Sequence, residues 1–215
     1  MLTLIVGGFF GDEGKGKISA YVTLAKNYDY AVRTGAINAG HTVVYRGNKF
    51  KLRTVSAGFI NEKTRLIIPP GALIRLDIFF NEVNELKVHD RIYVDYNTGV
   101  IEEEHVNREK EDPVLASIGS TFQGVGAAMS DRVLRRLKLA KYFKELTKYL
   151  SDTSLILNKA LDLGEKILVE GTQGTFLSLY HGTYPYVTSR DTTASALLSE
   201  IGVGPKRVDE VIVVF

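Results

Sequence analysis

The chain has 215 residues, of which 45% are hydrophobic, and its 27 Lys and Arg residues against 25 Asp and Glu residues leave a formal net charge of +2. This composition fits one large domain with a hydrophobic core, and the balanced charge argues against a general attraction to nucleic acid or to an anionic membrane. The sequence contains no cysteine, which excludes disulfides, thiolate metal sites and cysteine nucleophiles.

The chain begins with a short apolar segment, Met1–Gly8, which lacks the basic leader of a signal peptide and indicates a buried first strand. No apolar run approaches the roughly 20 residues that a membrane span needs. We therefore expect a cytoplasmic protein that has neither a membrane nor a nucleic acid as its partner.

Short apolar runs rich in Val, Ile and Leu alternate with longer helical patterns along the chain. The runs are too short for typical helices and too continuous for half-exposed strands, which indicates buried strands of a parallel or mixed sheet. In chain order they are Leu2–Val6, Tyr30–Arg33, Arg65–Ile68, Arg91–Val94, Lys166–Val169 and Val211–Phe215. The expected helices are Lys17–Lys26, Leu76–Leu86, Asp131–Leu150 and Ser154–Leu163.

Two further patterns complete the expected fold. Thr42–Tyr45 and Lys49–Leu52 flank Arg46-Gly47-Asn48, which predicts a small hairpin near residues 42–52. The helix expected at 131–150 rests on an apolar stripe at Val133, Leu134, Leu137, Ala140 and Leu146. Residues 1–215 are thus predicted to form a single α/β domain, with a mainly parallel or mixed central sheet flanked by helices.

A glycine-rich segment, Gly11–Lys17, follows the first predicted strand and leads into the first predicted helix. This order aims backbone N–H groups and a helix N-terminus at a phosphate, and Lys15 and Lys17 add positive charge. The segment matches the P-loop pattern except that Ile18 replaces the hydroxyl that would bind Mg²⁺. Because an acid in a phosphate cradle repels phosphate, we expect Asp12 to bind a metal or transfer a proton. The simpler alternative is a glycine-rich turn with solvated charges.

A second candidate site is Asn38-Ala39-Gly40-His41-Thr42, which follows the predicted strand Tyr30–Arg33. His41 stands there among small residues, whereas His89 and His105 stand among charged residues and are expected on the surface. The alternative for His41 is a structural or solvated loop histidine.

Five ordered motifs between residues 11 and 193 resemble the signatures of adenylosuccinate synthetases. Gly11–Lys17 and Asn38–Thr42 are the first two. The third runs from Ile118-Gly119-Ser120-Thr121 to Asp131-Arg132-Val133, the fourth is Glu170-Gly171-Thr172-Gln173-Gly174, and the fifth is the segment from His181 to Ser189. The resemblance covers nearly the whole chain.

The resemblance implies that GTP phosphorylates the 6-oxygen of IMP and that L-aspartate then displaces the phosphate, which gives adenylosuccinate on the AMP branch of purine biosynthesis. Asp12 is expected to take the N1 proton of the base and to bind Mg²⁺ together with the Gly40 carbonyl. His41 is expected to be a general acid toward the phosphate oxygens. Lys15 is expected to stabilise the transferring phosphoryl group.

The resemblance also implies the other contacts to the substrates. The expected IMP-binding residues are Asn38, Thr121, Arg135, Gln173 and Thr188, and the expected residues around the GTP phosphates are Gly11, Gly14, Lys15, Gly16, Lys17, Gly40 and Thr42. In the family, the arginine that matches Arg135 reaches the IMP phosphate of the neighbouring subunit, which implies a homodimer. The alternative is a solvated helix arginine beside Arg136.

The sequence departs from the family pattern in places that affect individual contacts. Ile37 replaces a frequent histidine, Phe122-Gln123 a glycine-arginine pair, Ala127 a proline, and Arg190-Asp191 a serine-asparagine pair. The family also continues beyond Val211–Phe215 with an aspartate-binding loop and a guanine-reading segment. We therefore expect a chain that is incomplete at its C-terminal side, the alternative being a natural terminal strand.

Two other functions are compatible with the motifs. One is a P-loop-type NTPase or kinase with Asp95 or Glu170 as its second acidic group, against which Ile18 argues. The other is a non-catalytic nucleotide-binding module, against which the joint presence of Asp12 and His41 argues.

Overall fold

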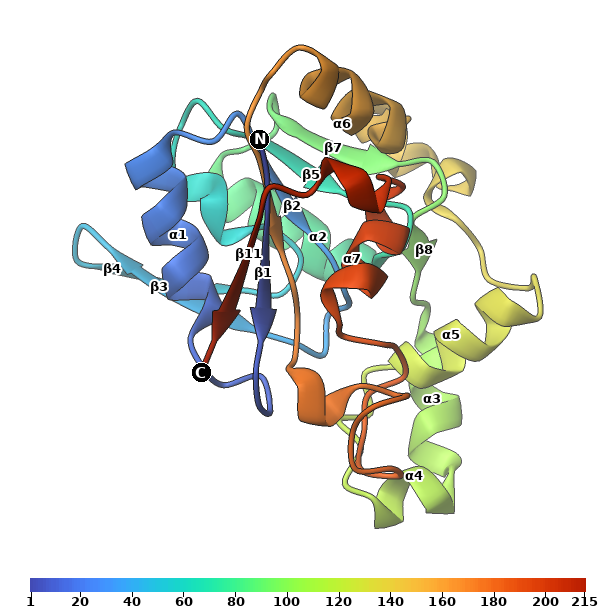
Figure 1. Cartoon of the computed structure of the whole chain (residues 1–215). Coiled ribbons are helices and arrows are strands. Elements are labelled where there is room, and N and C mark those ends of the chain that lie inside the picture. Colours follow the sequence, from blue (N-terminus) through green and yellow to red (C-terminus); the bar gives the residue numbers. More distant parts are fainter.

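A central sheet of seven strands with helices on both faces organises the molecule (Figure 1), as a computed structural model of residues 1–215 shows. The strand order is β11-β1-β10-β2-β5-β7-β9, and all neighbouring strands are parallel. These strands are β1 (Leu2–Gly7), β2 (Tyr30–Arg33), β5 (Arg65–Ile68), β7 (Ile92–Asp95), β9 (Leu150–Ser151), β10 (Ile167–Glu170) and β11 (Glu210–Val214). The predicted α/β class is confirmed.

Two small sheets accompany the central one. The predicted hairpin is present as β3 (His41–Tyr45) and β4 (Asn48–Leu52), joined by Arg46 and Gly47, which both have positive φ. Two residues of positive φ fit the twist of a tight hairpin. The short strands β6 (Leu73–Ile74) and β8 (Gly99–Val100) form a parallel pair.

Seven helices complete the fold, and none of them combines the length and the apolar character that a membrane crossing needs. They are α1 (Lys15–Lys26), α2 (Leu76–Leu86), α3 (Glu103–Glu111), α4 (Pro113–Ser117), α5 (Val125–Val133), α6 (Thr153–Asp162) and α7 (Ala194–Ile201). Helix α1 begins two residues before its predicted start, so that Lys15 and Gly16 belong to its first turn.

The inner strands are buried on both faces because alternate side chains enter different cores. The expectation of a buried strand at Val211–Phe215 is wrong, because β11 lies at the edge of the sheet and its Val211 and Val213 side chains are exposed. In β5, Leu66 and Ile68 pack in the larger cluster with Phe79 of α2, whereas Ile67 packs in a second cluster with Leu157 of α6 and Leu198 of α7. This explains why the strands read as continuous apolar runs in the sequence.

The predicted helix Asp131–Leu150 is wrong. Helix α5 ends at Val133, and Arg135 then takes a left-handed conformation with φ 62°, while the N–H of Arg136 donates to the carbonyl of Asp131 at 2.7 Å. The chain continues through two 3₁₀ helices, Ala140–Tyr142 and Lys144–Tyr149. The apolar residues of the supposed stripe do not share one face, because Leu137 packs in one core cluster, Ala140 and Leu146 in another, and Val133 and Leu134 are exposed.

The expectation of a surface position for His105 is also wrong. Its side chain is buried under α5, where Nε2 lies 3.3 Å from the Asp131 carboxylate and Nδ1 accepts the N–H of Glu102 at 2.9 Å. The charged neighbours in the sequence point outward, whereas His105 helps to close the first turn of α3.

Candidate functional site

The C-terminal ends of β1, β10 and β2 lie side by side in the sheet, and the segment that follows each strand contains one of the predicted motifs. In open parallel sheets, ligands bind at this edge. The motifs at Gly11–Lys17, Asn38–Thr42 and Gly171–Gly174 therefore meet in space although they are far apart in the sequence.

The turn between β1 and α1 requires glycine for two different reasons. Gly11 has φ 99°, and a Cβ there would lie 2.8 Å from the Cα of Gln173. Gly16 lies in the first turn of α1, and a Cβ there would lie 2.8 Å from the Cβ of His41. Because glycine has no Cβ, the turn can pack directly against the loop after β10 and against the start of β3.

Glu13 and Lys15 form a buried ion pair inside this turn. The Lys15 Nζ lies 2.7 Å from Glu13 Oε2, and the other carboxylate oxygen accepts the N–H groups of Phe9 and Gly11, both at 2.9 Å. Burial alone would raise the pKa of Glu13, but the bonds from Lys15, Gly11 and Phe9 lower it to about 2. Glu13 therefore stays ionised and occupies part of the predicted anion-binding turn.

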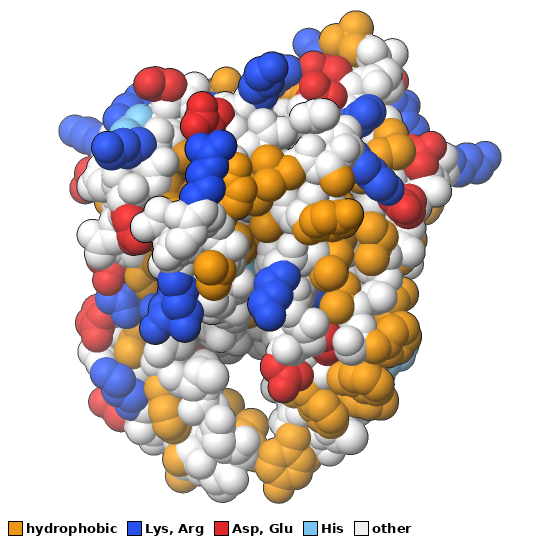
Figure 2. Space-filling model, turned by 90° about the vertical axis from the view of Figure 1, so that its left-hand side faces the viewer, with side chains coloured by type: hydrophobic (Ala, Val, Ile, Leu, Met, Phe, Trp, Pro, Cys, Tyr) orange, Lys and Arg blue, Asp and Glu red, His pale blue; other side chains and the backbone are white.

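A cleft of about 670 Å³ opens beside the turn. Its walls come from the loop after β1, from 38–41, from the segment between α3 and α5, and from the segment 173–189 after β10. The molecule is hollowed at the lower edge of the face in Figure 2, the level at which these segments meet in Figure 1. Phe10, Tyr184 and Tyr186 line the cleft and are largely exposed, so they offer aromatic surface to a planar ligand.

The cleft collects many of the predicted site residues but not all of them. Those in its wall are Gly11, Asp12, Asn38, Gly40, His41, Thr121, Gln173 and Thr188. Lys15 is turned onto Glu13 and is only 1% exposed, whereas Lys17 and Thr42 are exposed next to the cleft wall. Gly14 and Gly16 lie at the start of α1 and do not line the cleft. Arg135 lies exposed after α5, outside the cleft of its own chain.

Four of the cleft residues contain buried polar atoms without a hydrogen-bond partner in the chain. They are Nε2 of His41, Oε1 of Gln173, Oγ1 of Thr188 and Oγ of Ser189. Buried polar atoms are normally satisfied, so four such atoms in the wall of one cleft indicate a polar ligand. The amide nitrogen of Gln173 also lies 3.3 Å from Asn38 Oδ1, which connects two of the predicted IMP contacts.

Behind His41 lies a buried charge network that the motif analysis does not predict. Nη1 of Arg33 lies 2.9 Å from Oε1 of Glu170, and Nδ1 of His41 contacts both groups. Burial, and then the positive charge of Arg33, lower the pKa of His41 to about 4. Burial alone would raise the pKa of Glu170, but His41 and Arg33 lower it to about 2.

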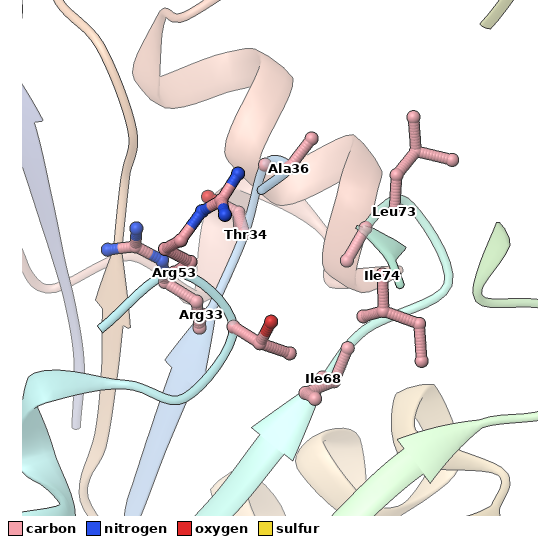
Figure 3. Close-up of a pocket in the computed structure, with 10 residues that line it drawn as sticks. Arg33, Thr34, Ala36, Arg53, Ile68, Leu73 and Ile74 are labelled. Carbon is pink, nitrogen blue, oxygen red and sulfur yellow. The ribbon is translucent and has the colours of Figure 1, made fainter. Parts of the chain in front are cut away.

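A small cavity of about 10 Å³ adjoins this network at Arg33 (Figure 3). Arg33 and Arg53 stand on one side of it, and the apolar side chains of Ile68, Leu73 and Ile74 on the other. Its volume corresponds to about one water molecule. The space is too small for a substrate.

Arg33 and Glu170 were the main residues missing from the predicted site, although Glu170 was considered as a second acidic group of a P-loop enzyme. Each is the last residue of an otherwise apolar strand, β2 and β10. A charge at the C-terminal end of a buried strand is the signal that could have identified both.

The parallel sheet, the glycine-rich turn into a helix and the aromatic-lined cleft at the C-terminal strand ends are features of the α/β class that includes nucleotide-binding proteins. The family model described as adenylosuccinate synthetase matches residues 4–139 and 136–215. The chain belongs to the adenylosuccinate synthetase family.

Curated relatives support this assignment over the whole chain. The chain is 49% identical over 219 residues to adenylosuccinate synthetase of Methanococcus aeolicus and 50% identical over 215 residues to that of Archaeoglobus fulgidus. Each alignment covers 99% of this chain but only 65% and 64% of the respective relative. The chain thus spans less than two-thirds of the length of these proteins.

Solved structures show the same architecture. The fully ligated adenylosuccinate synthetase of Plasmodium falciparum superposes with a TM-score of 0.91 at 25% identity, over 99% of this chain and 61% of that chain. Succinoaminodeoxyadenylate synthetase of cyanophage S-2L, bound to dGMP and to dATP as an energy donor, gives a TM-score of 0.86 at 27% identity, over 100% of this chain and 63% of that chain.

Proposed function

We propose that the protein takes part in the GTP-dependent ligation of IMP and L-aspartate to adenylosuccinate, through a 6-phosphoryl-IMP intermediate. The observation that carries this proposal is the coincidence of two independent signals. The buried atoms without partners in the cleft belong to His41, Gln173, Thr188 and Ser189, and the family resemblance assigns contacts with the reacting phosphate or IMP to the first three of these residues.

The first proposed step is the activation of the base. Asp12 is exposed in the cleft wall and accepts the N1 proton of IMP, which leaves more electron density on the 6-oxygen. That oxygen attacks the γ-phosphorus of GTP, the bond from the γ-phosphorus to its bridging oxygen breaks, and GDP leaves. The amino group of aspartate then attacks C6 and displaces inorganic phosphate.

His41 and the glycine-rich turn are the proposed partners of the phosphoryl group. Nε2 of His41 is buried without a partner in the cleft wall and donates a proton to the phosphate oxygens, which requires the ring to be protonated while the anion is bound. Lys17 lies exposed at the start of α1, where a helix N-terminus favours negative charge. Lys15 acts from within the turn, together with Glu13.

The donor set fits a Mg²⁺ ion. The Asp12 carboxylate and the Gly40 carbonyl both border the cleft, and oxygen atoms are the ligands that Mg²⁺ prefers. No three His, Asp or Glu side chains gather around one point, so these two residues would hold the ion together with substrate phosphates. When bound, Mg²⁺ would neutralise phosphate charge.

A homodimer belongs to the same proposal. Arg135 lies exposed beyond α5 in a left-handed conformation, beside the exposed apolar side chains of Val133 and Leu134. An arginine that lies outside the cleft of its own chain is free to enter that of a second copy, where it binds the phosphate of IMP.

The experiment that tests the proposal is calorimetric titration of IMP in the presence of Mg²⁺, with dGMP, AMP, GTP and ATP as comparison ligands. Selective binding of IMP supports the proposed substrate. Selective binding of dGMP would instead indicate the substrate type named for the cyanophage relative. Binding of ATP or GTP without any response to IMP would indicate the P-loop-type alternative.

A further inference from the structure

Arg53 connects two loops that form different parts of the cleft wall. It follows β4 directly, and its Nε donates to the carbonyl of Ile37 at 2.7 Å while its Nη2 donates to Oε1 of Gln123. The amide nitrogen of Gln123 in turn donates to the carbonyl of Thr121 at 3.1 Å. Three hydrogen bonds thus connect the residue before Asn38 with Thr121.

The partners of the Gln123 amide determine its orientation. A guanidinium contains only donors, whereas a backbone carbonyl only accepts. The amide oxygen therefore has to face Arg53 and the amide nitrogen has to face Thr121, because the reversed amide would make neither bond.

The connection is anchored outside the cleft. The backbone N–H of Arg53 donates at 2.6 Å to the buried carboxylate of Glu82 on α2. Neither Arg53 nor Gln123 lines the cleft, whereas Asn38 and Thr121 do. A planar guanidinium, with several donors in fixed directions, suits a connection between two loops. Its effect on a ligand in the cleft is therefore exerted through the loops.

The loop that contains Thr121 needs such a support because of its own backbone. Phe122 has φ 50°, a left-handed conformation that costs free energy in a residue other than glycine. Strain of this kind persists where the surrounding contacts hold the backbone in place. The two hydrogen bonds of the Gln123 side chain lie directly beside the strained residue.

We propose that Arg53 and Gln123 are positioning residues that set the relative position of Asn38 and Thr121 in the cleft. A ligand that contacts both loops binds when the loops are correctly placed, so its apparent affinity falls with the fraction of molecules in that arrangement. The choice of IMP as this ligand rests on the proposed function, but the connection between the loops does not.

The test is a double-mutant cycle of IMP affinity, measured by calorimetry in the presence of Mg²⁺. Arg53→Ala and Gln123→Ala each break the connection and are expected to weaken IMP binding about tenfold, as when the correct arrangement falls to about one-tenth of the population. The double variant is expected to bind no more weakly than Arg53→Ala alone, because the same connection cannot be broken twice.

The matched control is Arg91→Ala, which removes the same charge at a position outside the cleft. The Arg91 guanidinium also joins separate backbone segments, since it donates to the carbonyls of Phe59, Asn61 and Thr64 at 2.6, 3.1 and 2.6 Å. This variant is expected to lose stability and to keep its IMP affinity.

A second measurement follows the two loops without a ligand. The chain contains no cysteine, so spin labels can be attached through Val44→Cys on β3 and Ala116→Cys on α4, two exposed positions outside the cleft. Pulsed electron paramagnetic resonance is expected to give the same narrow distance distribution in the labelled chain with and without Arg91→Ala. Arg53→Ala and Gln123→Ala are each expected to broaden it.

Three outcomes would overturn the inference: unchanged IMP affinity in both single variants, effects that add to about a hundredfold in the double variant, or an unchanged distance distribution in the folded variants. If Arg53→Ala does not fold, Gln123→Ala in the partly exposed loop decides the question by the same two measurements. The distance distribution also decides it when the wild-type chain ignores IMP, so failure of the proposed function is recognised separately.

Discussion

Arg33 and Glu170 form a buried ion pair in which Nη1 and Oε1 are 2.9 Å apart and the two side chains are 3% and 0% exposed. They occupy the last positions of two adjacent strands, paired in register in β2 and β10. The pair thus lies at the C-terminal edge of the sheet, directly behind the wall of the cleft. Both residues of the pair contact Nδ1 of His41, so the pairing of β2 with β10 helps to fix the position of that ring.

Glu170→Ala is expected to lower the free energy of unfolding by about 3–5 kcal/mol, because it leaves the Arg33 charge buried without its partner. The measurement is urea denaturation followed by circular dichroism. The control is Asp162→Ala, which breaks the exposed pair between Asp162 and Arg207 at 2.8 Å and should lower the free energy of unfolding by only about 0–1 kcal/mol. Equal losses of unfolding free energy in both variants would contradict the assignment of Arg33 and Glu170 as a buried pair.

The acid dependence of stability provides a second prediction about Glu170. Although burial alone would raise it, contacts with His41 and Arg33 lower the pKa of Glu170 from its usual 4.5 to about 2 in the folded protein. A depressed pKa stabilises the folded state above pH 4.5, and this contribution disappears as the pH falls toward 2. The stability difference between wild type and Glu170→Gln should therefore be constant from pH 7 to 5 and narrow below pH 4.5. A difference that widens on acidification would contradict the lowered pKa.

Gly11→Ala is expected to weaken both folding and ligand binding. The new Cβ would lie 2.8 Å from the backbone of Gln173, in addition to the strain of φ 99°. Gly47→Ala is the matched control, because Gly47 has φ 79° but nothing within 4 Å of a Cβ. We expect the free energy of unfolding to fall by about 1 kcal/mol in the control and by about a further 1–3 kcal/mol in Gly11→Ala. IMP binding should be weaker only in Gly11→Ala. Denaturation and calorimetry measure the two effects.

The sequence predicted the sheet and the three loops of the site because both depend on local patterns. Continuous apolar runs identify strands buried on both faces, and the glycine-rich turn follows from steric requirements at Gly11 and Gly16. The helix expected at 131–150 was wrong because helical spacing alone cannot show that Leu137 and Leu146 pack in different cores.

The charge network behind His41 was harder to predict for a related reason. Arg33 and Glu170 are 137 residues apart in the sequence, and their pairing depends on β2 and β10 being neighbours in the sheet. The sequence shows that each strand ends in a charge but not which strands are adjacent. Likewise, the pattern of two lysines and two acids in the turn could not show that Glu13 binds Lys15 and the backbone N–H groups of the turn.

Thr188→Val is expected to weaken IMP binding without lowering the stability of the fold. The buried Oγ1 of Thr188 has no partner in the chain, so its replacement by a methyl group should leave stability unchanged or raise it slightly. IMP affinity should fall about tenfold, which corresponds to the loss of about one hydrogen bond. Thr192→Val is the control, because Oγ1 of Thr192 donates to the carbonyl of Gly174 at 3.0 Å. That variant should lose about 1 kcal/mol of stability and keep its IMP affinity.

Asp12→Asn separates binding from chemistry. The carboxylate is exposed in the cleft wall, and the amide has nearly the same shape but cannot accept the N1 proton of IMP. IMP affinity measured by calorimetry should therefore stay within about tenfold, while adenylosuccinate formation, followed by its absorbance, should fall by about 10²–10⁴-fold. Asp90→Asn, at an exposed position outside the cleft, is expected to change neither quantity. Turnover at the wild-type rate in Asp12→Asn would exclude this carboxylate as the base.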